Sequence, residues 1–380
     1  MQFTISAVSV VLVLCTMSSA AAFSVGGTWL SAAEKAALEK TAEMIATAGK
    51  GITATDEGPA TIGSRFEDFG IENSEENRRL YRQMLYDSPG CENFLSGAIL
   101  DPETIYQRSD DGVLFPELLT KKGIVPGVKP HLKIYTLPGT GGDTVMQGLD
   151  SLAVRCKEYY AAGCRFAKWR SPFVIDMEKG CPTDLAIRAN MHDLARYALI
   201  CQSEGLMPIV EPDVSLTGSH TLEQAVDVNI RIQSELYKAM IDHGVYMAGT
   251  TLKSNIVNPG RDCPVSYSVE EIAEANIFVF EQCFPIAMKG ANYLSGGQNL
   301  ETAAARLSAI NQANKKGPWN LSFSFSFALQ IPLLELCKDT SEFDFDAMSK
   351  LYIEELAIAG AAAKGEHEWK KGEGDHVGKE

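Results

Sequence analysis

Residues 166–170 read Phe-Ala-Lys-Trp-Arg, and the prediction of the fold begins from these five residues. Its aromatic and apolar side chains are typical of a buried strand, yet it also contains a lysine and an arginine. Because successive side chains of a strand point to opposite faces, Lys168 and Arg170 share one face. A buried lysine is costly unless a partner offsets its charge. The stretch therefore predicts a strand whose carboxyl end lies in a charged site.

Similar strand-like runs recur on both sides of this one, and helical patterns separate many of them. The eight predicted strands are residues 51–55, 95–100, 124–128, 166–170, 208–211, 246–253, 290–294 and 321–325. The predicted helices are residues 75–85, 144–162, 184–204, 222–243, 268–282 and 301–313. Alternation of strands and helices predicts a parallel sheet, and eight such units in one domain predict an α/β (β/α)8 TIM barrel.

The domain organisation expected from this pattern is a single barrel over residues 30–360. A capping box at Ser31-Ala32-Ala33-Glu34 predicts a leading helix that ends near residue 48. No internal repeat or linker divides the 380 residues. The polar, Gly-containing residues 361–380 predict a mobile tail.

Composition excludes several classes of protein. Hydrophobic residues make up 45% and charged residues 22% of the chain, which excludes a disordered, collagen-like or multi-span membrane protein. A net charge of −15 disfavours binding to nucleic acid. The nine cysteines form no Cys-x-x-Cys pair, so neither a zinc site nor a disulfide framework is indicated.

The N-terminal residues predict a targeting signal, with a buried apolar strand as the alternative. Residues 5–15 form an apolar run too short to span a bilayer, and Ala20-Ala21-Ala22 fits a signal-peptide cleavage site, so residues 1–22 are predicted to be removed. The mature chain is then expected to have no membrane contact. The Ala-Ala-Phe sequence ending at Phe23 resembles the pre-sequences of algae with complex plastids, which implies a plastid stroma or pyrenoid reached through a short transit segment. The secretory pathway and the cytoplasm are the alternatives.

Charged residues stand at the carboxyl ends of several predicted strands. Lys129, Lys168, Glu211 and Lys253 follow one another at intervals of 39 to 43 residues. Asp56 follows a predicted strand that lies two strands before the one that ends at Lys129. In a barrel, residues that recur once per unit at the same end of the strands converge on one mouth. Two interpretations are open: a structural salt-bridge cluster that plugs the barrel, and a catalytic site.

The residue types in this cluster favour amine chemistry. None of the six histidines lies in a His-x-x-x-His or carboxylate–His pattern, so a metal-assisted mechanism lacks ligands. A desolvated lysine near other cations has a lowered pKa and is nucleophilic at neutral pH. Such a lysine condenses with a ketone to form a Schiff base, an electron sink for making or breaking a carbon–carbon bond.

The chain resembles a class I fructose-bisphosphate aldolase over roughly residues 30–336. The motifs that carry the resemblance are Asp56-Glu57, residues 72–79 (ENSEENRR), residues 147–150 (QGLD), residues 166–170 (FAKWR), Val210-Glu211-Pro212, residues 249–253 (GTTLK) and residues 294–298 (LSGGQ). The resemblance implies reversible cleavage of fructose 1,6-bisphosphate to dihydroxyacetone phosphate and glyceraldehyde 3-phosphate. It also implies a homotetramer that needs no metal or other cofactor.

The resemblance assigns a role to each motif residue. It implies that Lys253 forms the Schiff base, that Glu211 donates and accepts protons, and that Lys168 tunes both electrostatically. It places Asp56 at the C4 hydroxyl of the sugar. The substrate-binding and phosphate-binding residues that it implies are Lys129, Arg170, Arg65, Ser295, Gly296, Gly297 and Ser324, with Arg65 and Arg170 at the phosphate remote from the ketone.

Some residues depart from the family pattern. Residues 324–330 read Ser-Phe-Ser-Phe-Ala-Leu-Gln where the family usually has Ser-Tyr-Gly-Arg-Ala-Leu-Gln, so Phe327 replaces a phosphate-binding arginine. Losing that charge-assisted contact is expected to cost roughly 1.5–3 kcal/mol of binding unless another cation substitutes. The sequence ends Gly378-Lys379-Glu380 without the family's terminal tyrosine. Two alternatives follow: a Schiff-base aldolase with altered phosphate specificity, and a non-catalytic scaffold barrel.

Overall fold

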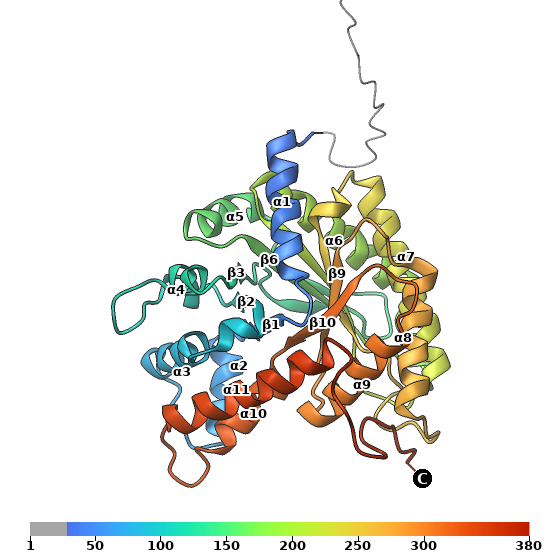
Figure 1. Cartoon of the computed structure of the whole chain (residues 1–380). Coiled ribbons are helices and arrows are strands. Elements are labelled where there is room, and N and C mark those ends of the chain that lie inside the picture. The colour runs from blue at the N-terminus through green and yellow to red at the C-terminus, as the bar shows by residue number, and fades with distance from the viewer. Residues whose placement is uncertain (1–28, 380) are drawn as a thin grey trace, which may run out of the picture.

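The computed structural model describes residues 29–379, and its centre is a closed barrel of eight parallel strands ringed by helices (Figure 1). Around the barrel the strands follow the order β1-β10-β9-β8-β7-β6-β3-β2. Their bounds are β1 Gly51–Thr55, β2 Leu95–Leu100, β3 Val125–Val128, β6 Phe166–Phe173, β7 Met207–Val214, β8 Thr251–Asn255, β9 Gly290–Leu294 and β10 Asn320–Phe325. The predicted (β/α)8 TIM barrel is confirmed.

Helices cover the outer face of this barrel. Their bounds are α1 Ala32–Ile45, α2 Pro59–Glu67, α3 Glu75–Asp87, α4 Phe115–Lys121, α5 Leu152–Ala161, α6 Asp184–Ser203, α7 Leu222–Asp242, α8 Val269–Cys283, α9 Leu300–Ala313, α10 Phe327–Glu335 and α11 Phe345–Ala362. The predicted capping box of α1 is present, because Glu34 N donates to Ser31 Oγ while Ser31 N donates to the Glu34 carboxylate. Such boxes satisfy amides that the first turn leaves without partners.

The inside of the barrel is filled by a separate apolar cluster. Ile52 of β1, Phe166 of β6 and Ile209 of β7 point inward and pack with Leu38 and Ile45 of α1. This cluster fills the barrel at the amino-terminal ends of its strands, and α1 closes that end of the barrel. The charged residues follow these apolar positions along the same strands. They therefore form the next layer, at the carboxyl ends where TIM-barrel sites lie.

The predicted strands 166–170 and 208–211 are longer in the structure, as β6 and β7, and two other predicted elements were wrong in type over part of their length. The predicted strand 246–253 is in fact a short 3-10 helix, Met247–Gly249, followed by β8. This helix packs against α1, and a Cβ at Gly249 would lie only 2.7 Å from Leu38 Cβ. The predicted helix 144–162 begins instead as strand β5, Thr144–Met146, which pairs antiparallel with β4, Ile134–Thr136. Gly148, with a φ of +128°, then interrupts the regular secondary structure before α5 begins.

The C-terminal segment contacts the barrel although its composition predicted a mobile tail. Arg306 of α9 donates from Nε to the carbonyl of Gly374 at 2.7 Å, and Val269 N of α8 donates to Asp375 Oδ1 at 2.8 Å. In Figure 1 this segment runs beside α8 and α9. A buried arginine side chain of α9 and a backbone amide of α8 thus hold the segment through hydrogen bonds.

The predicted signal peptide, residues 1–22, lies outside the described residues. No helix within residues 29–379 has both the length and the apolar character needed to cross a membrane. The eight cysteines from Cys91 to Cys337 are free thiols, and seven of them are buried. Burial raises the pKa of the Cys91 thiol to about 11, so this thiol is protonated at neutral pH.

Candidate active site

Four predicted residues meet as a chain of alternating charges at the mouth of the barrel. Lys253 Nζ of β8 lies 3.3 Å from Glu211 Oε1 of β7. Lys168 Nζ of β6 lies 2.8 Å from Glu211 Oε2 and 2.9 Å from Oδ2 of Asp56, the residue that follows β1 by one position. Lys168 and Glu211 are each 3% exposed and Lys253 is 4% exposed. The adjacent strands β6, β7 and β8 thus supply two amines and a carboxylate, and the segment after β1 supplies the second carboxylate of the buried cluster.

The electrostatics of the cluster keep its carboxylates ionised. Burial alone would favour the neutral acid, but the charges of Lys168, Lys253 and Lys129 outweigh it and hold the pKa of Asp56 well below its usual range. The pKa of Glu211 is likewise lowered, because Lys168, Lys253 and Arg170 overcome its burial. Burial disfavours the charge of Lys168, yet Asp56 and Glu211 raise its pKa above the ordinary value. Lys168 therefore stays a cation between two anions.

Lys129 joins this cluster through a residue that the sequence reasoning missed. Its Nζ donates to Asp101 Oδ2 at 2.9 Å and to the backbone carbonyl of Asp56 at 2.7 Å. Asp101 directly follows β2, so it occupies the same strand-end position as the predicted charges. Extending the once-per-strand rule to the run 95–100 would have found it.

Arg170 lies at the rim of the same mouth and is paired to Asp213. Its Nε donates to Asp213 Oδ2 at 2.6 Å, and its side chain is partly exposed. Both residues line a cavity of about 120 Å³ together with Asn255 and Gly296. The guanidinium thus faces the same space as the loop after β9.

Arg65 extends from α2 and contacts a group of residues apart from the lysines. Its Nη1 lies 2.9 Å from Glu57 Oε1, and Glu57 Oε2 lies 3.1 Å from Nη2 of Arg82 on α3. The Ser326 hydroxyl also donates to Glu57. Glu57 therefore links α2, α3 and the start of α10. No spacing of residues along the chain predicts this set of contacts, because its members come from distant segments.

The loop Ser295-Gly296-Gly297-Gln298 forms a tight turn after β9. Gly296 and Gly297 have φ values of +60° and +79°, which glycine adopts without strain. Gln298 N and Nε2 both donate to the carbonyl of Ser295, at 3.0 and 2.7 Å, which closes the turn. Ser324 of β10 is buried, and its hydroxyl makes no hydrogen bond to another described residue.

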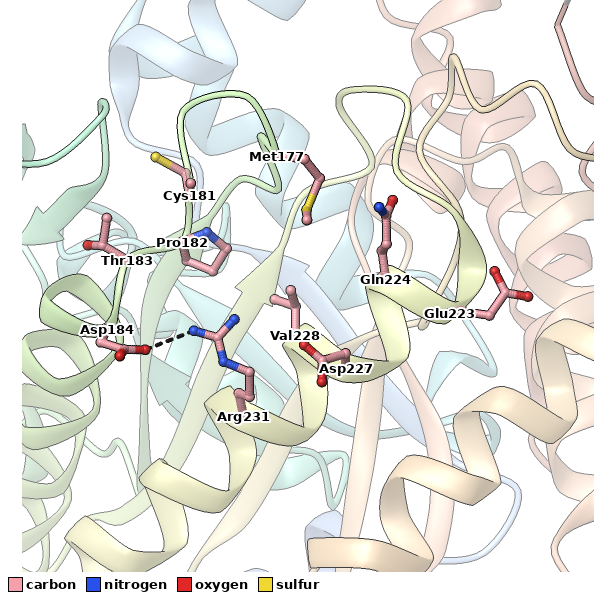
Figure 2. A pocket seen from close by; sticks show the side chains of 11 residues that line it. Met177, Cys181, Pro182, Thr183, Asp184, Glu223, Gln224, Asp227, Val228 and Arg231 are labelled. Carbon is pink, nitrogen blue, oxygen red and sulfur yellow. Dashed lines mark hydrogen bonds and ion pairs between the residues drawn. The ribbon is translucent and has the colours of Figure 1, made fainter.

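A larger hollow lies elsewhere on the surface. It has a volume of about 630 Å³ and is bordered by the loop before α6 and the first turns of α7 (Figure 2). Arg231 and Asp184 form an ion pair of 2.9 Å across it. None of the charged residues of the barrel mouth lines this hollow. Volume therefore does not identify the reactive site here, whereas the buried charge cluster does.

The chemistry of the cluster is that of amines and carboxylates. Within residues 29–379, no group of three or more His, Cys, Asp and Glu side chains could hold a metal ion. Lys253 has a carboxylate within proton-transfer distance, and a second amine holds that carboxylate in place. This arrangement suits a covalent amine mechanism with acid–base assistance.

Comparison with known proteins places this geometry in a family. The family model described as fructose-bisphosphate aldolase class-I matches residues 37–379. The fructose-bisphosphate aldolase of Dictyostelium discoideum is 43% identical over 328 residues, which cover 86% of this chain and 91% of that protein. The cytosolic fructose-bisphosphate aldolase 5 of Arabidopsis thaliana is 47% identical over 293 residues, 77% of this chain and 81% of that one.

A solved structure gives the same result in three dimensions. The fructose-bisphosphate aldolase of Plasmodium falciparum, in a ternary complex with TRAP and a small-molecule inhibitor, superimposes with a TM-score of 0.86 at 38% identity. The match covers 90% of this chain and 98% of that one. This chain therefore belongs to the class I fructose-bisphosphate aldolase family, whose members are lyases that work through a Schiff base without a metal.

Proposed function

We propose that this chain reversibly cleaves fructose 1,6-bisphosphate into dihydroxyacetone phosphate and glyceraldehyde 3-phosphate through a Schiff base on Lys253. One observation carries the proposal. Lys253 Nζ lies 3.3 Å from Glu211, whose other oxygen is paired to Lys168 at 2.8 Å. A scaffold barrel would have no physical need to bury such a cluster.

Glu211 is the proton carrier for Schiff-base formation in this proposal. It accepts a proton from the Lys253 ammonium, and the free amine adds to the C2 ketone of the sugar. Glu211 then returns a proton to the carbinolamine hydroxyl, which leaves as water and gives the protonated imine. Lys168 stabilises the ionised form of Glu211 before the first transfer and after the second.

Asp56 is the base for carbon–carbon cleavage in this proposal. It removes the proton of the C4 hydroxyl, the C3–C4 bond breaks, and the bonding electron pair moves into the imine to give an enamine. Glyceraldehyde 3-phosphate departs as the aldehyde. Transfer of the proton held by Asp56 to C3 and hydrolysis of the imine then release dihydroxyacetone phosphate and restore the Asp56 carboxylate and the Lys253 amine.

Two groups of residues would hold the substrate ends. Gly296 and Gly297, with Ser295 and Ser324, are proposed to bind the ketone-side phosphate, because backbone amides in a loop of this type bind anions. Lys129, Arg170 and Arg65 are proposed to contact the remaining hydroxyls and the remote phosphate. Arg65 is paired to Glu57 and is therefore held in place before substrate binds.

The test is an assay of the full-length protein with fructose 1,6-bisphosphate in the presence of a chelator. We expect equal amounts of both triose phosphates and no loss of rate from the chelator. Lys253→Met should abolish cleavage, whereas Lys289→Met, which removes a surface amine paired to Glu43, should not. Cleavage that the chelator stops, or that survives Lys253→Met, contradicts the proposal.

A second candidate is an aldolase of altered phosphate specificity, and Phe327 is the observation that favours it. Phe327 offers no cation beside the Gly297 loop, although both line one cavity. The ratio of kcat/KM for fructose 6-phosphate, which lacks the ketone-side phosphate, to that for fructose 1,6-bisphosphate measures this specificity. A ratio near one indicates that binding depends little on the ketone-side phosphate.

The cellular site and assembly are also proposed. Residues 1–22, followed by a short transit segment, would direct the chain to a plastid, where the reaction would run mainly toward condensation, and four copies would associate. A fluorescent fusion to residues 1–28 should collect in the plastid, and light scattering should give four times the chain mass. Fluorescence in the cytosol or the secretory pathway, or a monomer mass, would contradict these two points.

A further inference from the structure

The family has an arginine at position 327, beside the loop 295–298 that is proposed to bind the ketone-side phosphate. This chain has Phe327 there, and another arginine lies beside the loop. Phe327 is 38% exposed at the start of α10. It lines a cavity of about 520 Å³ whose wall also includes Gly297 and Arg261. Arg261 comes from the segment between β8 and α8, so a different element supplies this positive charge.

The guanidinium of Arg261 holds the back of the loop. Its Nη2 donates to the carbonyls of Gly296 and Gly297, at 3.3 Å each. In a trans peptide the N–H points away from the preceding C=O. The amide of Gly297 is therefore directed away from Arg261, and it donates to no other group within residues 29–379. Donation to the carbonyl polarises the peptide and strengthens that amide as a donor to an anion.

Arg261 is fixed in this position by its own backbone. Its N donates to the carbonyl of Leu216 at 2.8 Å, and the N of Asp262 donates to the carbonyl of Gly218 at 2.9 Å. The two loops touch so closely that a Cβ at Gly260 would lie 2.2 Å from the Gly218 oxygen. The loop after β7 thus positions the arginine before any ligand binds.

Nearby carboxylates do not cancel the charge of Arg261. It makes no ion pair within the described part of the chain, and the adjacent Asp262 is paired to Lys379 at 2.7 Å. Arg306 holds the other end of the loop, because its Nη1 donates to Gln298 Oε1 at 2.7 Å. The loop is therefore flanked by positive charge on the side away from its free amide.

We propose that Arg261 is a positioning and specificity residue for the ketone-side phosphate, and that it compensates for the cation absent at position 327. It acts through the Gly296–Gly297 peptide rather than by direct contact with the reacting atoms. The inference rests on the proposed function. It predicts selectivity for donors that carry a phosphate on the ketone side over donors that lack it.

The test compares Arg261→Gln and Arg261→Lys with the unchanged protein. Condensation with glyceraldehyde 3-phosphate is measured with dihydroxyacetone phosphate and with free dihydroxyacetone as donors. Arg261→Gln should raise KM for dihydroxyacetone phosphate about tenfold, with kcat within about twofold, and should leave KM for free dihydroxyacetone unchanged. Arg261→Lys should recover part of the loss. Arg231→Gln is the matched control, since Arg231 pairs with Asp184 at the separate hollow of Figure 2, and should change nothing.

A double substitution tests the compensation itself. In a Phe327→Arg background, Arg261→Gln should raise KM less than it does alone, because the restored guanidinium takes over the phosphate. An unchanged KM for dihydroxyacetone phosphate in Arg261→Gln, or an equal rise for free dihydroxyacetone, overturns the inference. Calorimetric binding of dihydroxyacetone phosphate to the same variants separates this result from a failure of the proposed function, because affinity is measured without turnover.

Discussion

Lys253 and Glu211 stand on adjacent strands with their reactive atoms 3.3 Å apart. The parallel register of β7 and β8 pairs Ile209 with Thr251, two residues before each of them. The two-residue repeat of a strand then turns both side chains inward at the same level. The spacing between amine and carboxylate is therefore a consequence of the barrel, and the predictions below depend on it.

Glu211→Gln removes the proton carrier and keeps the side-chain volume. Because each proton transfer of imine formation loses its base, we expect kcat to fall about 10²- to 10⁴-fold, with a smaller change in KM. Steady-state cleavage kinetics measure this. The control is Asp213→Asn, two residues farther along β7. It should act mainly on KM, because Asp213 is paired to Arg170. A Glu211→Gln variant with unchanged kcat would remove Glu211 from the mechanism.

Lys168→Met removes the cation between two carboxylates. The charge of Lys168 counteracts burial in lowering the pKa of both Asp56 and Glu211, so both pKa values should rise in the variant. The acidic limb of the kcat/KM profile should move to higher pH by about 1–3 units. The measurement is a pH–rate profile of the variant beside the unchanged protein. An unshifted limb would show that these carboxylates do not set it.

Glu57→Ala tests the contacts that position Arg65. Arg82 is only 2% exposed, so removing Glu57 leaves a buried positive charge without its partner. We expect a loss of about 3–5 kcal/mol in the free energy of unfolding. Glu117→Ala breaks an exposed pair with Lys121 and should cost less than about 1 kcal/mol. Urea denaturation of both variants gives the comparison, and equal losses would refute the structural role of Glu57.

Glu355→Gln makes stability less dependent on pH. Glu355 of α11 is 6% exposed, and burial, with the nearby charges of Glu301 and Glu335, raises its pKa to about 8. An unfolded glutamate has a pKa of about 4.3. Between these values only the folded state holds the proton, so the stability of the unchanged protein falls as pH rises from about 4.3 through about 8.

The urea midpoint at pH 6 and at pH 9 measures this effect. Glu355→Gln should be stabilised relative to the unchanged protein more strongly at pH 9 than at pH 6. The exposed neighbour Glu354, changed to Gln, should show no such difference. An equal effect of Glu355→Gln at both pH values would contradict the buried-carboxyl account.

Much of the barrel could be predicted from sequence because its strands are short buried runs bounded by turn residues. The predicted runs 51–55, 95–100 and 290–294 have the same bounds as β1, β2 and β9. Once the strands form a closed parallel barrel, their carboxyl ends must converge. This is why spacing alone brought Asp56, Lys168, Glu211 and Lys253 into one cluster.

The elements and contacts that could not be predicted from the sequence depend on contacts between distant segments. Residues 144–146 carry a helical pattern, but pairing with residues 134–136 turns them into a strand. The predicted helices omitted α2, α4, α10 and α11. Of these, α10 contains Pro332, a residue that disfavours a helix interior. The link from Arg65 through Glu57 to Arg82 joins two helices to the segment after β1, and no local spacing encodes it.

Trapping the covalent intermediate identifies the amine that forms the Schiff base. The full-length protein is treated with dihydroxyacetone phosphate and borohydride, digested, and analysed by peptide mass. We expect one reduced adduct, on the peptide that contains Lys253 and on its amine, and none in Lys253→Met. No adduct, or an adduct on Lys168 or Lys129 instead, would refute a Schiff base on Lys253.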